Sequence, residues 1–246
     1  MKLTERVFLV GSGKLGFSIS NEFDCHVYLI DGGSELALID AGVGLEVERI
    51  LANVSADGFD PLDIGKVLLT HVHSDHAGGA AALKQETGAA VAIHEAEAAL
   101  LESADEDAIG LRIARADGYY PDDYHMAPCR PDIVLSDGQE VSVGDLSISV
   151  VHFPGHSKGA VCYAVSVGGT KHLFSGDTVF LNGEIGLLNC VGSSLEDYRA
   201  NVGRLTGLGI DVLLPGHLSV VLSRGQRHLD MAAENLRRLM PPPNAF

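Results

Sequence analysis

Three histidines and one aspartate are packed into the short stretch Thr70-His71-Val72-His73-Ser74-Asp75-His76. Imidazole and carboxylate groups crowded this closely repel or desolvate one another unless something binds them, and both are good ligands for a divalent metal ion. The apolar run Lys66-Val67-Leu68-Leu69 comes directly before them and predicts a short buried strand. The stretch therefore predicts a metal site whose ligands leave the end of a rigid element.

Three later strands end in the same way. The predicted strands 148–153, 172–174 and 212–214 each run into a glycine turn that is followed at once by His156, Asp177 or His217. Glycine tolerates the backbone angles of a sharp turn and leaves room for a ligand. Since four strand ends can lie along one edge of a pair of sheets, we expect seven side chains to meet there: His71, His73, Asp75, His76, His156, Asp177 and His217.

Seven ligands are too many for one tetrahedral zinc ion and favour two ions with open positions. We expect His71, His73 and His156 to share one ion, and Asp75, His76 and His217 to share the other. Asp177 can bridge the two because a carboxylate has two oxygens. Two ions about 3.5–4 Å apart can hold a hydroxide between them at neutral pH. The two carboxylates and the hydroxide leave about one positive charge on the ion pair, so the pocket favours an anionic substrate or a polarised carbonyl.

The order of strands and helices predicts the architecture. Strands come in runs broken by single helices, in two similar halves, which predicts an α+β sandwich of two mixed sheets packed face to face with helices outside. We expect one domain over 1–246, with an insertion at about 95–128 that is helical from Glu95 to Ala116. The expected strands are 7–10, 25–30, 35–39, 67–69, 90–93, 132–135, 140–143, 146–153, 161–167, 172–174 and 211–214. The expected helices include 80–86, a helix that begins at Ser193 with Glu196 as its capping-box partner, and 226–240.

The composition argues against several classes of binding partner. The net charge is −16 with 17 basic residues, which argues against a nucleic-acid partner because such binding needs a basic face. The sequence contains no apolar run of the ~20 residues that span a bilayer and no secretory leader, so we expect a cytoplasmic protein without a membrane partner. The four cysteines are far apart, which predicts neither disulfides nor a thiolate metal site. A homodimer is left open.

Several other features of the sequence are not assigned to the site. Residues 11–16 fit GxGxxG, but the next residues, 17–20, look like a strand rather than a helix, so a hairpin loop is favoured over a dinucleotide site. Five further histidines are treated as structural: His26, His94, His152, His172 and His228. Four residues of the insertion are candidates for lining the pocket, with ordinary loop positions as the alternative: Tyr119, Tyr120, Tyr124 and His125.

The chain resembles the metallo-β-lactamase superfamily in its HxHxDH…H…D…H form, from about Val7 to the last helix. The resemblance implies an αββα sandwich and a two-metal site with the ligand sets given above. It also implies that Asp40 supports the site from behind. The implied mechanism is hydrolysis by a metal-bridging hydroxide, with Asp75 orienting the nucleophile and carrying a proton. Zinc is the first expectation for the metal, with iron and manganese as alternatives.

The sequence constrains the substrate, and the subfamily that would act on it, less tightly than it constrains the metal site. The segments 154–157 and 176–180 resemble the glyoxalase II-like thioesterases, although the appended helical domain of true glyoxalase II is missing. Phe180 stands where acyl-homoserine lactonases usually carry a tyrosine. We therefore expect a hydrolase of a small ester, thioester or lactone. The alternatives are a phosphodiesterase, a mononuclear iron dioxygenase of the persulfide type and a non-catalytic metal-binding module.

Overall fold

The computed structural model describes residues 1–238, 240 and 242–246. Eleven strands in the described chain form two sheets, one with the order β1-β2-β3-β4-β5-β6 and the other with the order β11-β10-β9-β8-β7. The strands of the first sheet are β1 (Val7–Gly11), β2 (Val27–Asp31), β3 (Leu36–Ile39), β4 (Ile64–Leu68), β5 (Ala90–His94) and β6 (Ile133–Leu135). Those of the second sheet are β7 (Glu140–Val143), β8 (Leu146–His152), β9 (Val161–Val167), β10 (Thr170–Gly176) and β11 (Val212–Pro215).

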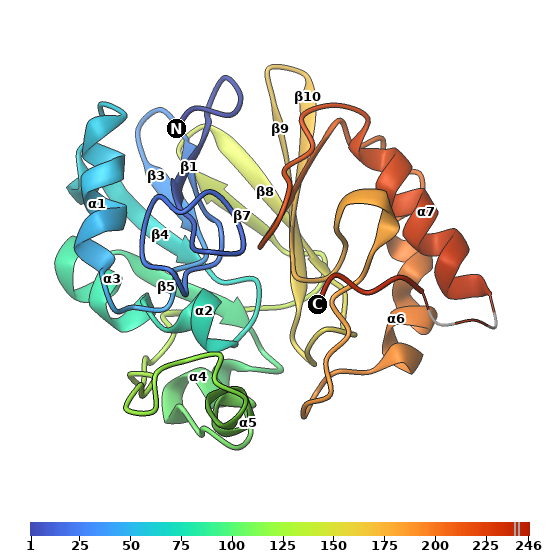
Figure 1. Cartoon of the computed structure of the whole chain (residues 1–246). Coiled ribbons are helices and arrows are strands. Elements are labelled where there is room, and N and C mark those ends of the chain that lie inside the picture. The colour runs from blue at the N-terminus through green and yellow to red at the C-terminus, as the bar shows by residue number, and fades with distance from the viewer. Residues whose placement is uncertain (239, 241) are drawn as a thin grey trace.

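Helices cover the outer faces of both sheets (Figure 1). The α-helices are α1 (Val47–Ala56), α2 (Ser74–Ala77), α3 (Ala80–Thr87), α4 (Ala98–Ser103), α5 (Leu111–Ala116), α6 (Leu195–Asn201) and α7 (Gly225–Arg237). The short 3₁₀ helices are η1 (Pro61–Asp63), η2 (Leu181–Gly183) and η3 (Val202–Leu205). In Figure 1, α1 and α3 lie outside the first sheet and α6 and α7 outside the second.

Three apolar clusters hold these layers together. The central cluster joins the inner faces of the two sheets, for example Tyr28 and Leu68 from the first with Phe174 and Leu214 from the second. The second packs α1 and α3 on the first sheet, and the third packs α6 and α7 on the second sheet. Strands buried on both faces are continuously apolar, which is why β1, β3 and β11 show no polar alternation. The αββα sandwich and the α+β class are therefore confirmed.

The single helix expected over 95–116 is wrong. The structure has α4 and α5 instead, separated by residues 104–110. Ala104 and Gly110 both have positive φ, and a right-handed helix cannot continue through such a residue. These two helices and the loop that follows lie at one end of the sandwich, below the first sheet in Figure 1.

Three smaller expectations also need correction. Residues 17–20 are not a strand, although the loop from residue 12 to 26 does join the antiparallel strands β1 and β2. The cap of α6 is Ser194, whose Oγ accepts a hydrogen bond from the Asp197 N–H, so the helix begins one residue later than predicted. Helix α7 ends at Arg237 because Arg238 is extended; the predicted end includes residue 239, which lies outside the described residues.

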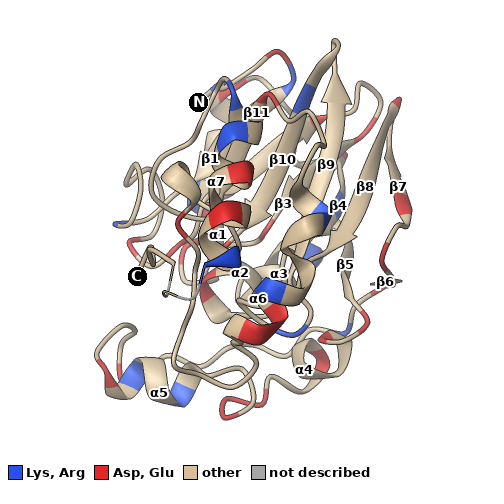
Figure 2. Ribbon diagram, turned by 90° about the vertical axis from the view of Figure 1, so that its right-hand side faces the viewer, with Lys and Arg blue, Asp and Glu red and all other residues tan. Residues whose placement is uncertain are grey.

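The surface carries mixed charge. In the view of Figure 2, Lys and Arg are interspersed with Asp and Glu over the visible helices. None of the helices in the described part of the chain has the length and apolar character needed to cross a bilayer.

Candidate metal centre

The sheet topology brings the predicted ligand residues to one edge. Strands β3, β4 and β5 are parallel neighbours, and so are β10 and β11. Strand β8 has the same direction as β10 because both pair antiparallel with β9. The segments that follow β8, β10 and β11 therefore leave the second sheet at the same end. The segment that follows β4, which includes α2, meets them there, since His73 contacts His156. These four segments carry the seven residues.

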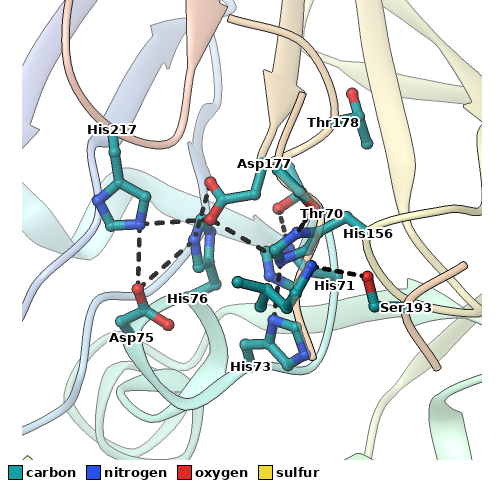
Figure 3. Close-up of polar contacts among 12 residues, drawn as sticks. Thr70, His71, His73, Asp75, His76, His156, Asp177, Thr178, Ser193 and His217 are labelled. Carbon is teal, nitrogen blue, oxygen red and sulfur yellow. Dashed lines mark hydrogen bonds and ion pairs between the residues drawn. The ribbon is translucent and has the colours of Figure 1, made fainter. Parts of the chain in front are cut away.

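The seven side chains form a continuous cluster (Figure 3). His73 Nδ1 lies 2.9 Å from His156 Nε2. On the other side, His217 Nε2 lies 3.0 Å from Asp75 Oδ2. Asp177 lies between them, with one oxygen 3.3 Å from His76 Nε2 and the other 3.5 Å from His217 Nε2. Among these seven residues, three sets have ligand atoms within 4.8 Å of one another: His71, His73 and His156; His71, His76 and Asp177; Asp75, His76 and His217.

The cluster fits divalent metal ions. Three of its buried polar atoms have no hydrogen-bond partner: His71 Nε2, His76 Nε2 and Asp177 Oδ1. Buried polar atoms almost always have a hydrogen-bond partner. Three unpartnered atoms that converge on one place therefore indicate that a ligand binds there. Their chemistry, imidazole nitrogen and carboxylate oxygen, is that of zinc and related metals.

Neighbouring groups fix which nitrogen of each ring is available. Asp40 Oδ2 lies 2.8 Å from His76 Nδ1, and Gly186 O lies 2.6 Å from His156 Nδ1. Thr70 Oγ1 lies 3.0 Å from His71 Nδ1 and itself donates to the Asp40 carboxylate. With Nδ1–H donating to these oxygens, the Nε2 lone pairs of the three rings point into the cluster. This is the arrangement by which proteins orient metal-bound histidine.

Asp40 forms hydrogen bonds both with Thr70, which follows β4, and with His76, which lies in α2. Its Oδ1 accepts a hydrogen bond of 2.7 Å from the Thr70 N–H, and its φ of 64° is unusual for a residue other than glycine. Strain of this kind persists only where the surroundings enforce it. The position thus agrees with the support that the resemblance implies for Asp40.

Burial favours the neutral form of His71 and His73, whereas at His76 the neighbouring Cys25 and the carboxylates of Asp177, Asp40 and Asp75 outweigh burial and raise the pKa well above its usual value. Burial lowers the pKa of His71 well below its usual value and that of His73 to about 3, and the neighbouring histidines add to both shifts. Burial by itself raises the pKa of Asp75, but His76 and His217 outweigh it and bring that pKa to about 2. Neutral imidazole and ionised carboxylate are the forms that bind metal.

A cavity of about 480 Å³ opens over the cluster. Its polar floor includes His73, Asp75, His156, Asp177 and His217. Its walls come from α5 and residues 109–110 before it, from Lys14, from residues 117–120 and 188–190, and from Phe246. The largely apolar wall residues are Ile109, Leu111, Ile113, Ala114, Leu188 and Phe246.

The four candidate pocket residues between positions 119 and 125 divide into two pairs. Tyr119 and Tyr120 line the cavity, and Tyr120 donates a hydrogen bond of 3.0 Å to Asp75 Oδ1. Tyr124 packs behind Tyr120 and donates to Val43 O, and the largely exposed His125 pairs with Glu106. Neither of the second pair lines the cavity.

Sequence reasoning missed Glu97. Its carboxylate is buried and accepts hydrogen bonds of 2.9 Å from the N–H groups of Val72 and Gly159, which tie the loop of His71 and His73 to the loop of His156. Nothing in its alanine- and glutamate-rich surroundings distinguishes it in the sequence.

His26 is structural, as expected. Both of its ring nitrogens form hydrogen bonds away from the cluster, one with Ser12 Oγ and the other with Leu218 O.

An αββα sandwich with a histidine- and aspartate-lined cluster at one end of both sheets defines a class of metal-dependent hydrolases. The chain belongs to the metallo-β-lactamase superfamily, whose family model matches residues 20–217. It is a metal-dependent hydrolase, and the likeness predicted from the sequence is confirmed.

Curated proteins and solved structures of hydrolases are similar to this chain. The chain is 32% identical over 214 residues to acyl-coenzyme A thioesterase MBLAC2 of Gallus gallus, covering 79% of this chain and 73% of that protein. It is 29% identical over 197 residues to the probable polyketide biosynthesis zinc-dependent hydrolase BaeB of Bacillus velezensis, covering 79% and 70%. Among structures, FEZ-1 metallo-β-lactamase from Legionella gormanii superposes with a TM-score of 0.73 at 20% identity, covering 96% and 92%, which shows the shared fold.

Proposed function

We propose that this protein is a dinuclear metal-dependent hydrolase of a small-molecule acyl thioester. The observation that carries the proposal is the convergence of seven ligand-type side chains, with three orphaned buried atoms among them, beneath a largely apolar cavity. The thioester is supported by two relatives that are named thioesterases: the Gallus gallus protein and an atrochrysone carboxyl ACP thioesterase of Aspergillus fumigatus. The latter is 30% identical over 203 residues, covering 82% of this chain and 53% of that protein.

In this proposal His71, His73 and His156 would hold one ion and Asp75, His76 and His217 the other, with Asp177 available to both. The ion pair supplies, when bound, a hydroxide nucleophile and an electrophile for the substrate carbonyl. Hydrolysis then forms a carbon–oxygen bond and breaks the carbon–sulfur bond, so that a carboxylate and a thiol leave. Zinc is the first choice of metal.

The chain's own residues position the reaction. Asp75 lies on the cavity floor with one oxygen fixed by Tyr120 and the other beside His217, so it can orient the nucleophile and accept its proton. The apolar wall of Ile109, Leu111 and Ile113 suits an acyl chain and keeps water from it. Lys14 also lines the cavity and provides a cation for an anionic part of the substrate.

The test begins with the metal content of protein made without added zinc, followed by a substrate panel. We expect two metal equivalents per chain and a kcat/KM for an acyl thioester at least about tenfold above that for the matched oxygen ester. Chelation should abolish the activity and added metal should restore it. Faster turnover of bis-aryl phosphates would favour a phosphodiesterase, and one iron per chain with oxygen uptake would favour a dioxygenase. Either result would overturn the proposal, as would faster turnover of a lactone.

A further inference from the structure

The last described segment, residues 242–246, packs beside the loop that follows Asp177. The Ile185 N–H donates to Pro243 O at 3.1 Å, and the Ala245 N–H donates to Ile185 O at 2.9 Å. Ile185 and Asn244 thus form a parallel β-bridge, and Ile185 pairs antiparallel with Val179 on its other side. The segment is held as a short third strand on this loop.

Asn244 fixes the register of that strand. Its Nδ2 donates to Leu187 O at 2.9 Å, and its Oδ1 accepts from the Leu187 N–H at 2.8 Å. Both halves of one side-chain amide therefore pair with both backbone groups of one residue. This two-point contact determines where the side chain two positions later lies.

That side chain is Phe246, whose ring lies beside the cluster of seven candidate ligand side chains. Its centroid is 5.7 Å from that of His217, 6.4 Å from that of His156 and 5.5 Å from that of Phe180. Gly186 allows this approach, because a Cβ there would meet His156 Nδ1 at 2.9 Å and the Phe246 ring at 3.1 Å. The ring lines the cavity and is 44% exposed, so a ligand can reach it.

We propose that Phe246 is a specificity-determining residue that limits the bulk of the substrate next to its reacting carbonyl. The inference rests on the proposed thioesterase function. His156 and His217 belong to opposite ligand sets, so a ring that borders both covers the place where the seven side chains converge. A carbonyl that reacts there has its neighbouring carbon against the Phe246 ring, which admits a straight acyl chain and clashes with a branched one.

The first test compares two thioesters of equal carbon number, butyryl and isobutyryl. Phe246→Ala should raise the ratio of kcat/KM for the branched over the straight substrate at least about tenfold, since one methyl group in a pocket is worth 10–200-fold. Asn244→Ala, which frees the segment, should shift the ratio in the same direction. Phe17→Ala is the matched control, because Phe17 has a similar exposed fraction, 43%, and does not line the cavity. An unchanged ratio in an active Phe246→Ala protein overturns the proposal.

The second test needs no turnover. The chain contains no tryptophan, so Phe246→Trp introduces a single tryptophan, which can be excited selectively, at the cluster. Binding of Co²⁺ should quench it strongly. Leu62→Trp is the control, because Leu62 lies before β4, at the end opposite His71, and the five-residue strand alone separates the two by roughly 16 Å. Equal quenching of the two proteins would overturn the placement of Phe246. Absence of thioester cleavage by the unaltered protein, with Phe246→Trp still quenched, would instead count against the proposed function alone.

Discussion

Tyr120 donates a hydrogen bond of 3.0 Å to Asp75 Oδ1, so a phenol from the loop after α5 holds a carboxylate of the histidine-rich loop 45 positions away. Burial, and then the charge of Asp75, raises the pKa of Tyr120 well above its usual value. The phenol therefore stays protonated and remains a donor across the working range of pH. Through this bond, the segment after α5 helps to orient the residue that we assign to proton transfer.

Replacing this donor should affect activity more than stability. We expect Tyr120→Phe to lower kcat about tenfold with little change in metal content, because Asp75 loses the bond that orients its carboxylate. Tyr124→Phe is the matched control, since Tyr124 stacks on Tyr120 but donates to Val43 O. It should cost about 1 kcal/mol of unfolding free energy and leave kcat unchanged. Equal losses of kcat in the two variants would contradict the role given to Tyr120.

Asp177 should determine whether the site holds two ions. Its oxygens face His76 on one side and His156 and His217 on the other, so loss of one oxygen weakens both ligand sets. We expect Asp177→Asn to bind about one metal equivalent instead of two, and to lose at least about 100-fold in kcat. Metal analysis after gel filtration measures the first effect. The exposed Asp145, which pairs with Arg6, gives the control Asp145→Asn. Two retained equivalents in Asp177→Asn would contradict the bridging role.

Asp40 should tune metal affinity without touching the metal. Its carboxylate accepts from Thr70 and holds His76 Nδ1. We expect Asp40→Asn to weaken metal binding about 10–100-fold, the usual effect of losing the group behind a histidine ligand. Competition with a chromophoric chelator measures this affinity. Glu140→Gln, on the exposed edge strand β7, should leave it unchanged.

His26 should make the fold sensitive to acid. Burial lowers its pKa to about 4, from an ordinary value of 6.5. Between these two pH values the unfolded chain binds a proton that the folded chain does not, so the free energy of unfolding falls as the pH falls. At pH values above the unfolded-state pKa, neutral His26 contributes its full amount to the free energy of unfolding, about 3 kcal/mol. This contribution is lost progressively towards pH 4.

The measurement is urea unfolding of metal-free protein at about pH 7.5 and about pH 5. The unaltered chain should lose about 2 kcal/mol more between these conditions than His26→Gln, because the variant has no proton to bind there. The metal-free state removes the separate effect of acid on metal binding. Equal losses in the two proteins would contradict the neutral, buried state assigned to His26.

Much of the sandwich could be predicted from local patterns. The strands over 140–143 and 161–167 have the predicted bounds, because apolar runs between turn residues determine them locally. The break between α4 and α5 could not be predicted, since Ala104 has a helix-favouring side chain and takes its positive φ only from the packing around it. The roles of the seven ligand residues stay predictions, although their side chains lie together.

Glu97 and Phe246 lie beyond the reach of sequence patterns. Each acts through partners distant in the chain: Glu97 through Val72 and Gly159, and Phe246 through the pairing of Asn244 with Leu187. Neither residue stands in a motif. Their importance follows from contacts that exist only once the two sheets have packed.

The sequence by itself determined the type of chemistry, because imidazoles and carboxylates at strand ends have few uses other than binding metal. Tertiary structure alone decided the shape of the cavity and which side chains border it, since those walls come from loops whose conformations depend on long-range packing. Ligand chemistry is a property of residue types at short spacing, whereas the shape of a cavity depends on where distant segments meet.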